Sequence, residues 1–151
     1  MNVSINFDMD GTIADLYAVE GWLADLESHN ARPYREAKPM VNLSQLAKYI
    51  HKAQANGYQV NIVSWLSKTS NQEYDEKVTR AKQEWLKKHL RSVQFDNIVI
   101  VPYGTPKSTC VERSDMGILF DDEQKNRAEW NGVSAEPSEI IEILKALVKG
   151  V

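Results

Sequence analysis

An acidic turn that directly follows a short apolar strand constrains this chain more than any other feature. Residues 2–7 alternate polar and apolar side chains with the period of two that predicts a β-strand. Asp8 and Asp10 follow two residues apart, so both carboxylates leave an extended chain on the same side. Gly11 permits a sharp turn, and Thr12 can hydrogen-bond within it. Because open α/β sheets bind ligands at such strand ends, this turn is a candidate site.

Strand and helix patterns alternate along the rest of the chain. Further strands are predicted at 58–65, 95–101 and 117–120, with a weak edge strand at 133–135. Helices are predicted at 16–27, 40–56, 73–91 and 124–130, and a last helix begins at Pro137. Residues 30–39 contain two prolines and are expected to form a loop. This alternation predicts an α/β fold, a Rossmann-like parallel sheet with helices on both faces.

The length fits a single domain that covers residues 1–151, since a chain of this size can bury a sizeable core. The segment between the first two predicted strands is longer than one crossover helix requires. We therefore expect residues 16–40 to form a small cap insertion that covers the strand tips.

The composition is that of an ordinary globular protein, with 42% hydrophobic and 26% charged residues. The formal net charge of −3 argues against a general affinity for nucleic acid or for an anionic membrane. No apolar run approaches the ~20 residues of a membrane span, and no signal peptide is apparent. Because Cys110 is the only cysteine, no internal disulfide can form, and we expect a cytoplasmic protein.

Polar side chains follow four successive strands of the predicted sheet. They are Asp8 and Asp10, Ser64, Lys107 after a loop, and the pair Asp121 and Asp122. Because parallel strands end at one edge of a sheet, we expect these groups to converge. Clustered carboxylates repel one another unless they hold a cation, and Mg²⁺ prefers such oxygen ligands. A cation, a lysine, a hydroxyl and main-chain N–H groups together suit a phosphoryl group.

The ordered set resembles the four motifs of the haloacid dehalogenase (HAD) superfamily. Asp8-Met9-Asp10-Gly11-Thr12 is similar to its first motif, Asp-x-Asp-Gly-Thr. Ser64 matches the Ser/Thr of the second motif, Lys107 the lysine of the third, and Asp121-Asp122 the acidic pair of the fourth. The resemblance covers essentially the whole chain and implies a HAD-type fold.

The resemblance also implies a phosphoaspartate mechanism. Asp8 would be the nucleophile, and Asp10 would protonate the leaving oxygen and then activate water. Mg²⁺ would be held by Asp8, the main-chain carbonyl of Asp10 and a carboxylate of Asp121 or Asp122, with Asp121 favoured as the direct ligand. The residues implied to bind the substrate's phosphate group are Ser64, Trp65 and Lys107. A dehalogenase needs no second acid, so the presence of Asp10 favours phosphoryl chemistry.

Several of these residues have a structural interpretation when each is taken alone. Asp-x-Asp is common in turns, and Ser64 resembles any serine at a strand end. The pair Asp121-Asp122 could cap the helix that follows it. Lys68, just past the second predicted strand, is an alternative to Lys107.

The aromatic residues and the predicted insertion leave further alternatives open. Trp85 and Trp130 are expected in the core rather than at a substrate. Four residues of the insertion are candidate contacts to the leaving group of a substrate, with packing or solvent as the alternative: Trp22, Tyr34, Arg35 and Lys38.

The leading functional hypothesis is a Mg²⁺-dependent phosphomonoesterase that acts on a small soluble metabolite. Lys82-x-x-Trp85 and residues 104–107 loosely resemble the small 5'(3')-deoxyribonucleotidase branch, which makes a nucleoside monophosphate the first candidate. A small cap leaves the site open, so a nucleic acid 3'-phosphatase is the alternative enzyme, against which the lack of basic excess argues. A non-catalytic metal- or phosphate-binding regulator is the other class. The sequence also leaves open a homo-oligomer in which a second subunit covers the site.

Overall fold

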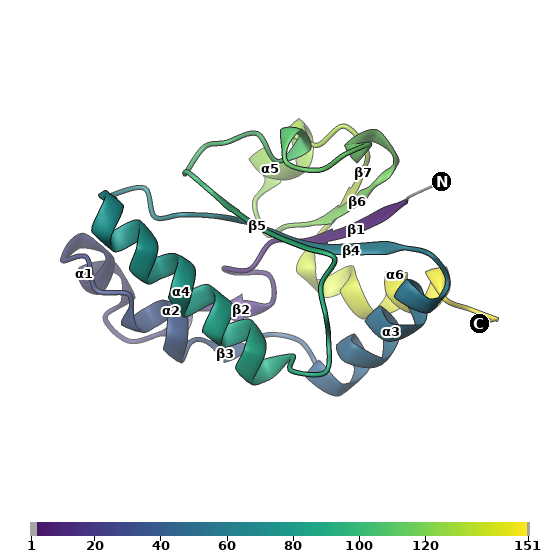
Figure 1. Ribbon diagram of the computed structural model, residues 1–151, viewed down its shortest axis with the longest axis horizontal. Helices are drawn as coiled ribbons and strands as arrows, with labels where there is room; N and C mark the ends of the chain where they lie inside the picture. Colours follow the sequence, from purple (N-terminus) through teal and green to yellow (C-terminus); the bar gives the residue numbers. More distant parts are fainter. Residues whose placement is uncertain (1–2, 151) are drawn as a thin grey trace.

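A five-stranded parallel sheet forms the centre of the molecule (Figure 1). The computed structural model describes residues 3–150, so Asn2 of the first predicted strand lies outside the described residues. The strands are β1 (Ser4–Phe7), β4 (Gln59–Trp65), β5 (Asn97–Val101), β6 (Ile118–Phe120) and β7 (Val133–Ala135), in the order β5-β4-β1-β6-β7. All neighbouring strands of this sheet are parallel, which confirms the predicted α/β architecture.

β1 is the central strand, and its polar residues are as buried as its apolar ones. Ser4 and Asn6 are both fully buried beside Ile5 and Phe7. The side-chain amide of Asn6 donates to Ser4 Oγ at 2.9 Å, and its oxygen accepts from Asn61 on β4, also at 2.9 Å. These bonds offset the cost of removing the polar groups from water.

Helices cover both faces of the sheet (Figure 1). On one face lie α3 (Leu43–Ala55), α4 (Gln72–His89) and α6 (Ile140–Leu147), which share one apolar core with β1 and β4. On the other face lies α5 (Gln124–Glu129), with the 3₁₀ turns η2 (Lys107–Thr109) and η3 (Ser114–Met116). Among residues 3–150, no helix combines the length and the apolar character needed to cross a membrane.

Asparagine side chains cap the first turns of α3 and α4. Asn42 Oδ1 accepts from the main-chain N–H of Gln45 at 3.0 Å, and Asn71 Oδ1 accepts from that of Tyr74 at 2.8 Å. Each cap satisfies one of the N–H groups that a helix start leaves without a partner. The two helices therefore begin where short polar side chains can fold back on the backbone.

Between β1 and α3 lies a group of short elements beside α4 (Figure 1). They are β2 (Ala14–Asp15), η1 (Leu16–Ala18), α1 (Trp22–Glu27), α2 (Arg32–Glu36) and β3 (Lys38–Pro39). β2 and β3 pair antiparallel and form a small second sheet. A second apolar cluster, in which Tyr34 of α2 packs with Tyr74 and Val78 of α4, holds the group against the main domain.

Two elements of this segment differ from the sequence prediction. The single helix predicted at 16–27 is divided into η1 and α1, because Gly21 between them adopts a positive φ of 76°. The loop predicted at 30–39 contains α2 and β3. Pro33 lies in the first turn of α2, where a helix needs no main-chain N–H donor, so the proline does not exclude the helix.

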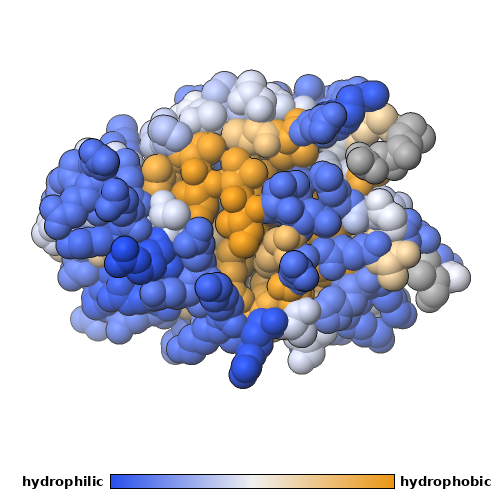
Figure 2. Space-filling view, in the orientation of Figure 1, coloured by the Kyte–Doolittle hydropathy of each residue, from blue (hydrophilic) through white to orange (hydrophobic). Residues whose placement is uncertain are grey.

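β5 is an edge strand that carries apolar side chains at the surface. Ile98 is 43% exposed. Next to it, Leu86, Leu90 and Phe95 line a shallow groove. Figure 2 shows a hydrophobic band across this face of the molecule, in the region of β5. This edge of the sheet is therefore only partly covered.

Candidate active site

Main-chain hydrogen bonds and Gly11 determine the shape of the turn after β1. The N–H groups of Thr12 and Ile13 donate to the carbonyl oxygen of Met9 at 3.1 and 3.0 Å. Gly11 has a φ of +81°, and a Cβ at this position would overlap Asp122 Oδ2. The positive φ therefore favours glycine, and a residue with a Cβ would also displace the Asp122 carboxylate.

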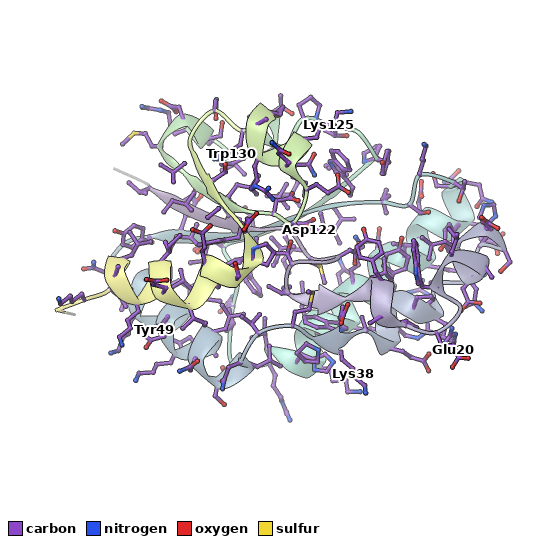
Figure 3. All side chains as sticks on the ribbon, turned by 180° about the vertical axis from the view of Figure 1, so that it is seen from behind. Glu20, Lys38, Tyr49, Asp122, Lys125 and Trp130 are labelled. Carbon is purple, nitrogen blue, oxygen red and sulfur yellow. The ribbon has the colours of Figure 1, made fainter. Side chains whose placement is uncertain are left out.

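Three carboxylates meet at the ends of the neighbouring strands β1 and β6. Asp8, Asp121 and Asp122 each offer an oxygen, and these oxygens lie within 4.8 Å of one another. The buried Lys107 Nζ donates to Asp8 Oδ1 at 2.8 Å and to Asp121 Oδ2 at 2.7 Å. Thr12 Oγ1 donates to the other oxygen of Asp8 at 2.9 Å. Figure 3 shows Asp122 near the middle of the molecule.

The cluster carries more negative charge than Lys107 neutralises. Burial, and after it the charge of Asp8, raise the pKa of Asp122 to about 8. Burial and Asp8 also raise the pKa of Asp121, although Lys107 opposes them. Burial by itself would lower the pKa of Lys107, but Asp8 and Asp121 outweigh it and raise that pKa. A cation would relieve the remaining repulsion, and carboxylate oxygens fit a hard divalent ion such as Mg²⁺.

Hydrogen bonds distinguish the two aspartates that follow β6. Asp121 Oδ1 accepts from the main-chain N–H of Glu123 at 2.9 Å, and its Oδ2 accepts from both Lys107 and Asn126. The side chain of Asp122 has a longer contact, with Thr12 Oγ1 at 3.4 Å, and the single proton of that hydroxyl is donated at shorter range to Asp8. Within the described residues, Asp122 thus keeps more acceptor capacity for a ligand than Asp121.

Asp10 is paired with a buried lysine that the sequence analysis did not assign to the site. Lys82 Nζ donates to Asp10 Oδ2 at 2.9 Å, to Ser64 Oγ at 2.5 Å and to the carbonyl oxygen of Trp65 at 2.7 Å. It also lies 5.1 Å from the centre of the Tyr34 ring. Burial raises the pKa of Asp10, and Lys82 opposes this rise.

The helical period contained a signal for Lys82. Val78, Lys82 and Trp85 recur at intervals of four and three residues, so the lysine lies on the apolar face of α4. A lysine at a core position indicates a buried acidic partner, because an unpaired ammonium is costly to remove from water.

A cavity of about 320 Å³ opens beside the carboxylates. Six of the predicted site residues line it: Asp8, Asp10, Trp65, Lys107, Asp121 and Asp122. Ser64 is fully buried and lies behind this wall, where its Oγ accepts from Lys82. The strand ends therefore bring the predicted side chains together, but Ser64 contacts Lys82 rather than the cavity.

Aromatic side chains line the same cavity. Tyr17 and Trp22, between β1 and α3, meet edge to face with ring centres 5.0 Å apart. Trp65 at the end of β4 and Tyr103 after β5 form a second pair at 4.9 Å. The Lys107 ammonium lies 5.4 Å from the centre of the Trp65 ring, so aromatic and charged parts of the wall adjoin.

The structure distinguishes between the two candidate lysines. Lys107 contacts Asp8, whereas Lys68 lies on the cavity wall 6.0 Å from the centre of the Tyr103 ring. Lys107 begins η2, and its side chain is buried in contact with the carboxylates of Asp8 and Asp121.

The aromatic residues and the residues of the predicted insertion differ in whether they line the cavity. Trp22 and Tyr34 line the cavity, whereas Arg35 and Lys38 are exposed and lie outside its wall. Figure 3 shows Lys38 at the outer surface, away from Asp122. Trp85 and Trp130, which were expected in the core, are 1% and 4% exposed.

Comparisons with known proteins rest on structure alone, since neither a family model nor a curated protein matches this sequence. The D,D-heptose 1,7-bisphosphate phosphatase from Burkholderia thailandensis is similar in fold, with a TM-score of 0.54 and 13% identity. The match covers 87% of this chain and 75% of that one. The HAD domain of the effector protein Lem4 from Legionella pneumophila gives a TM-score of 0.46 at 12% identity, over 98% of this chain and 96% of the other. The protein therefore shares the α/β fold of the heptose bisphosphate phosphatase, which agrees with the fold that the motif resemblance implied.

Proposed function

We propose that this protein is a Mg²⁺-dependent phosphomonoesterase that acts on a small soluble phosphorylated metabolite through an aspartyl-phosphate intermediate. The observation that carries the proposal is the cluster of Asp8, Asp121 and Asp122 with Lys107 buried among them. A metal ion and a lysine beside these oxygens would complement the negative charge of a phosphate group. The likeness in fold to a bisphosphate phosphatase supports the same chemistry.

Asp8, Asp122 and the main-chain carbonyl of Asp10 are the proposed metal ligands. We favour Asp122 over Asp121 as the direct ligand because the Asp121 carboxylate already accepts three hydrogen bonds, two of them at Oδ2. Asp121 would instead hold Lys107 in place. Bound Mg²⁺ would supply positive charge against the phosphoryl oxygens and the attacking carboxylate.

Asp8 is the proposed nucleophile. One carboxylate oxygen of Asp8 attacks phosphorus, the bond to the leaving oxygen breaks, and Asp10 gives that oxygen a proton. Asp10 then takes a proton from water as the water oxygen attacks the phosphorus of the aspartyl phosphate. The bond between phosphorus and the Asp8 oxygen breaks, which releases inorganic phosphate and restores the Asp8 carboxylate. Bonds from Lys107 and Thr12 to its two oxygens hold the Asp8 carboxylate in one orientation.

Ser64, Trp65 and Lys107 stay the predicted residues for binding the phosphate group. Trp65 and Lys107 line the cavity, which supports their part of this prediction. Ser64 is fully buried, so its predicted contact with the phosphate group is tested separately below.

A nucleoside monophosphate is the first candidate substrate. The carboxylates share their cavity with Tyr17, Trp22, Trp65 and Tyr103, and a flat nucleobase stacks well on such rings. The cavity volume of about 320 Å³ lies at the lower end of the roughly 300–1,000 Å³ typical of small-molecule sites. Both features favour a mononucleotide over a larger ligand.

Phosphate release from a panel of substrates tests the proposal. The panel holds nucleoside 5'- and 3'-monophosphates, sugar phosphates, a nitrophenyl phosphate and a 3'-phosphorylated oligonucleotide, each with Mg²⁺ and with a chelator. We expect Mg²⁺-dependent release that Asp8→Asn abolishes. The matched control Asp115→Asn changes an exposed aspartate of η3 and should retain activity.

The same panel separates the alternatives. Faster turnover of the oligonucleotide would favour a nucleic acid 3'-phosphatase. Binding of Mg²⁺ without phosphate release from any substrate would refute the proposed enzymatic activity and favour a non-catalytic regulator.

A further inference from the structure

We propose that Lys82 is a positioning residue for Asp10, and that Ser64 in this chain serves to anchor Lys82. The inference rests on the proposed function, in which Asp10 transfers the proton to and from the reacting oxygen. It adds to that function a buried residue from α4 that lies outside the motif set.

The ammonium of Lys82 has three protons, and three oxygens accept them. Asp10 Oδ2, Ser64 Oγ and the Trp65 carbonyl oxygen lie 2.9, 2.5 and 2.7 Å from Nζ. The side chain of Lys82 is 1% exposed, so water does not compete for these bonds. Its acceptors belong to the turn after β1 and to the end of β4. Through Lys82, α4 therefore contacts the ends of both strands.

This arrangement gives the two oxygens of Asp10 different roles. Oδ2 accepts from Lys82, which leaves Oδ1 free to exchange a proton with the leaving oxygen of a substrate. Asp10 lines the cavity, and its side chain is 16% exposed, so the carboxylate is reachable from the substrate side. Proton transfer requires a carboxyl held within hydrogen-bond distance of the reacting oxygen. Lys82 provides this restraint.

Ser64 fits the role of an anchor better than that of a phosphate ligand. An ammonium only donates, so Ser64 Oγ must accept from Lys82. Ser64 is 0% exposed and lies outside the cavity wall. Tyr34, which does line the cavity, presents its ring 5.1 Å from the same ammonium. The lysine is thus enclosed by the acid, the anchor and an aromatic ring.

Two substrates of similar shape test this role. Benzyl phosphate has an alkoxide leaving group that needs a proton, whereas nitrophenolate departs without one. The value of kcat/KM reports the steps up to cleavage of the ester. We expect Lys82→Met to lower kcat/KM at least about tenfold for benzyl phosphate and less than about threefold for the nitrophenyl ester, because general acid catalysis is lost only where it is needed. Lys87→Met, an exposed lysine on the same helix, should leave both values unchanged.

Ser64→Ala tests the anchor and also replaces Lys82→Met if that variant does not fold, as judged by thermal unfolding. This variant should lower kcat/KM for benzyl phosphate more than kcat/KM for the nitrophenyl ester. The preference is the same as for Lys82→Met, but the decrease should be smaller. Combined with Asp10→Asn, Lys82→Met should cause no further loss on benzyl phosphate, since the lysine acts through that acid.

Each outcome decides a separate point. Equal losses on the two esters in Lys82→Met, with an active wild type, would refute the positioning role and leave the proposed function standing. A rise in KM for both esters in Ser64→Ala, without leaving-group selectivity, would identify Ser64 as a phosphate ligand and refute the anchor. Absence of release by the wild-type protein would refute the proposed function, and this inference with it.

Discussion

Removal of the Lys107 ammonium should destabilise the metal-free protein strongly. Lys107→Met keeps a long apolar stem of similar volume, so packing changes little. The variant leaves Asp8 and Asp121, whose side chains are 10% and 0% exposed, without their shared cation. Breaking a buried pair by removal of one partner typically costs about 3–5 kcal/mol, which is the expected loss in the free energy of unfolding.

Mg²⁺ should offset part of this loss. The Lys107→Met cluster keeps three carboxylates within 4.8 Å and lacks the competing ammonium, so it should bind the metal more tightly than the wild type. A ligand at about 100 times its dissociation constant stabilises a folded state by about 2.7 kcal/mol. The difference between variant and wild type should therefore shrink when Mg²⁺ replaces the chelator.

Urea unfolding followed by tryptophan fluorescence measures both effects at constant pH. Lys87→Met is the matched control, since this exposed lysine on α4 should change stability by less than about 0.5 kcal/mol. A loss below about 1 kcal/mol in chelator would refute the assignment of Lys107 as the cation of a buried carboxylate cluster. Equal destabilisation with and without Mg²⁺ would refute the metal site.

Three other perturbations follow from the same geometry. Since the pKa of Asp122 rises from 3.8 to about 8 on folding, the folded state binds this proton more tightly, and the metal-free protein should lose stability as pH increases through that window. Asp122→Asn should reduce this slope in urea titrations at several pH values, and a steeper slope would contradict the assignment. Gly11→Ala should lower the free energy of unfolding by at least about 1 kcal/mol, because a φ of +81° strains a residue with a Cβ and the added methyl group would displace the Asp122 carboxylate. An unchanged urea midpoint would contradict this. Trp22→Ala should raise KM for nucleoside monophosphates about tenfold, because the stacking contact is lost, and should leave KM for ribose phosphate unchanged. Equal changes in KM for both substrates would show that the Trp22 ring does not bind the base.

The order of the elements, and the edge of the sheet at which the polar residues meet, could be predicted from the amino-acid pattern. Period-two and helical patterns are local, and Asp8, Lys107 and Asp121 each follow a strand that such a pattern predicts. Parallel strands then bring residues far apart in the chain to one edge, so convergence required no knowledge of side-chain packing. α2 was missed because its stability comes from Tyr34 packed on α4 rather than from local propensity.

Which of these groups are in contact depends on how the elements pack. Lys82 lies on α4, whereas its partner Asp10 lies in the turn after β1 and its partner Ser64 lies on β4, and the packing of the helix over the strand ends sets their distances. The same packing buries Ser64 behind the cavity and places Lys107 rather than Lys68 against Asp8. A local pattern predicts the direction in which a side chain leaves its own element. The partner it meets depends on how distant elements are stacked, because the cost of burying a charge is met only when the fold supplies the opposite one.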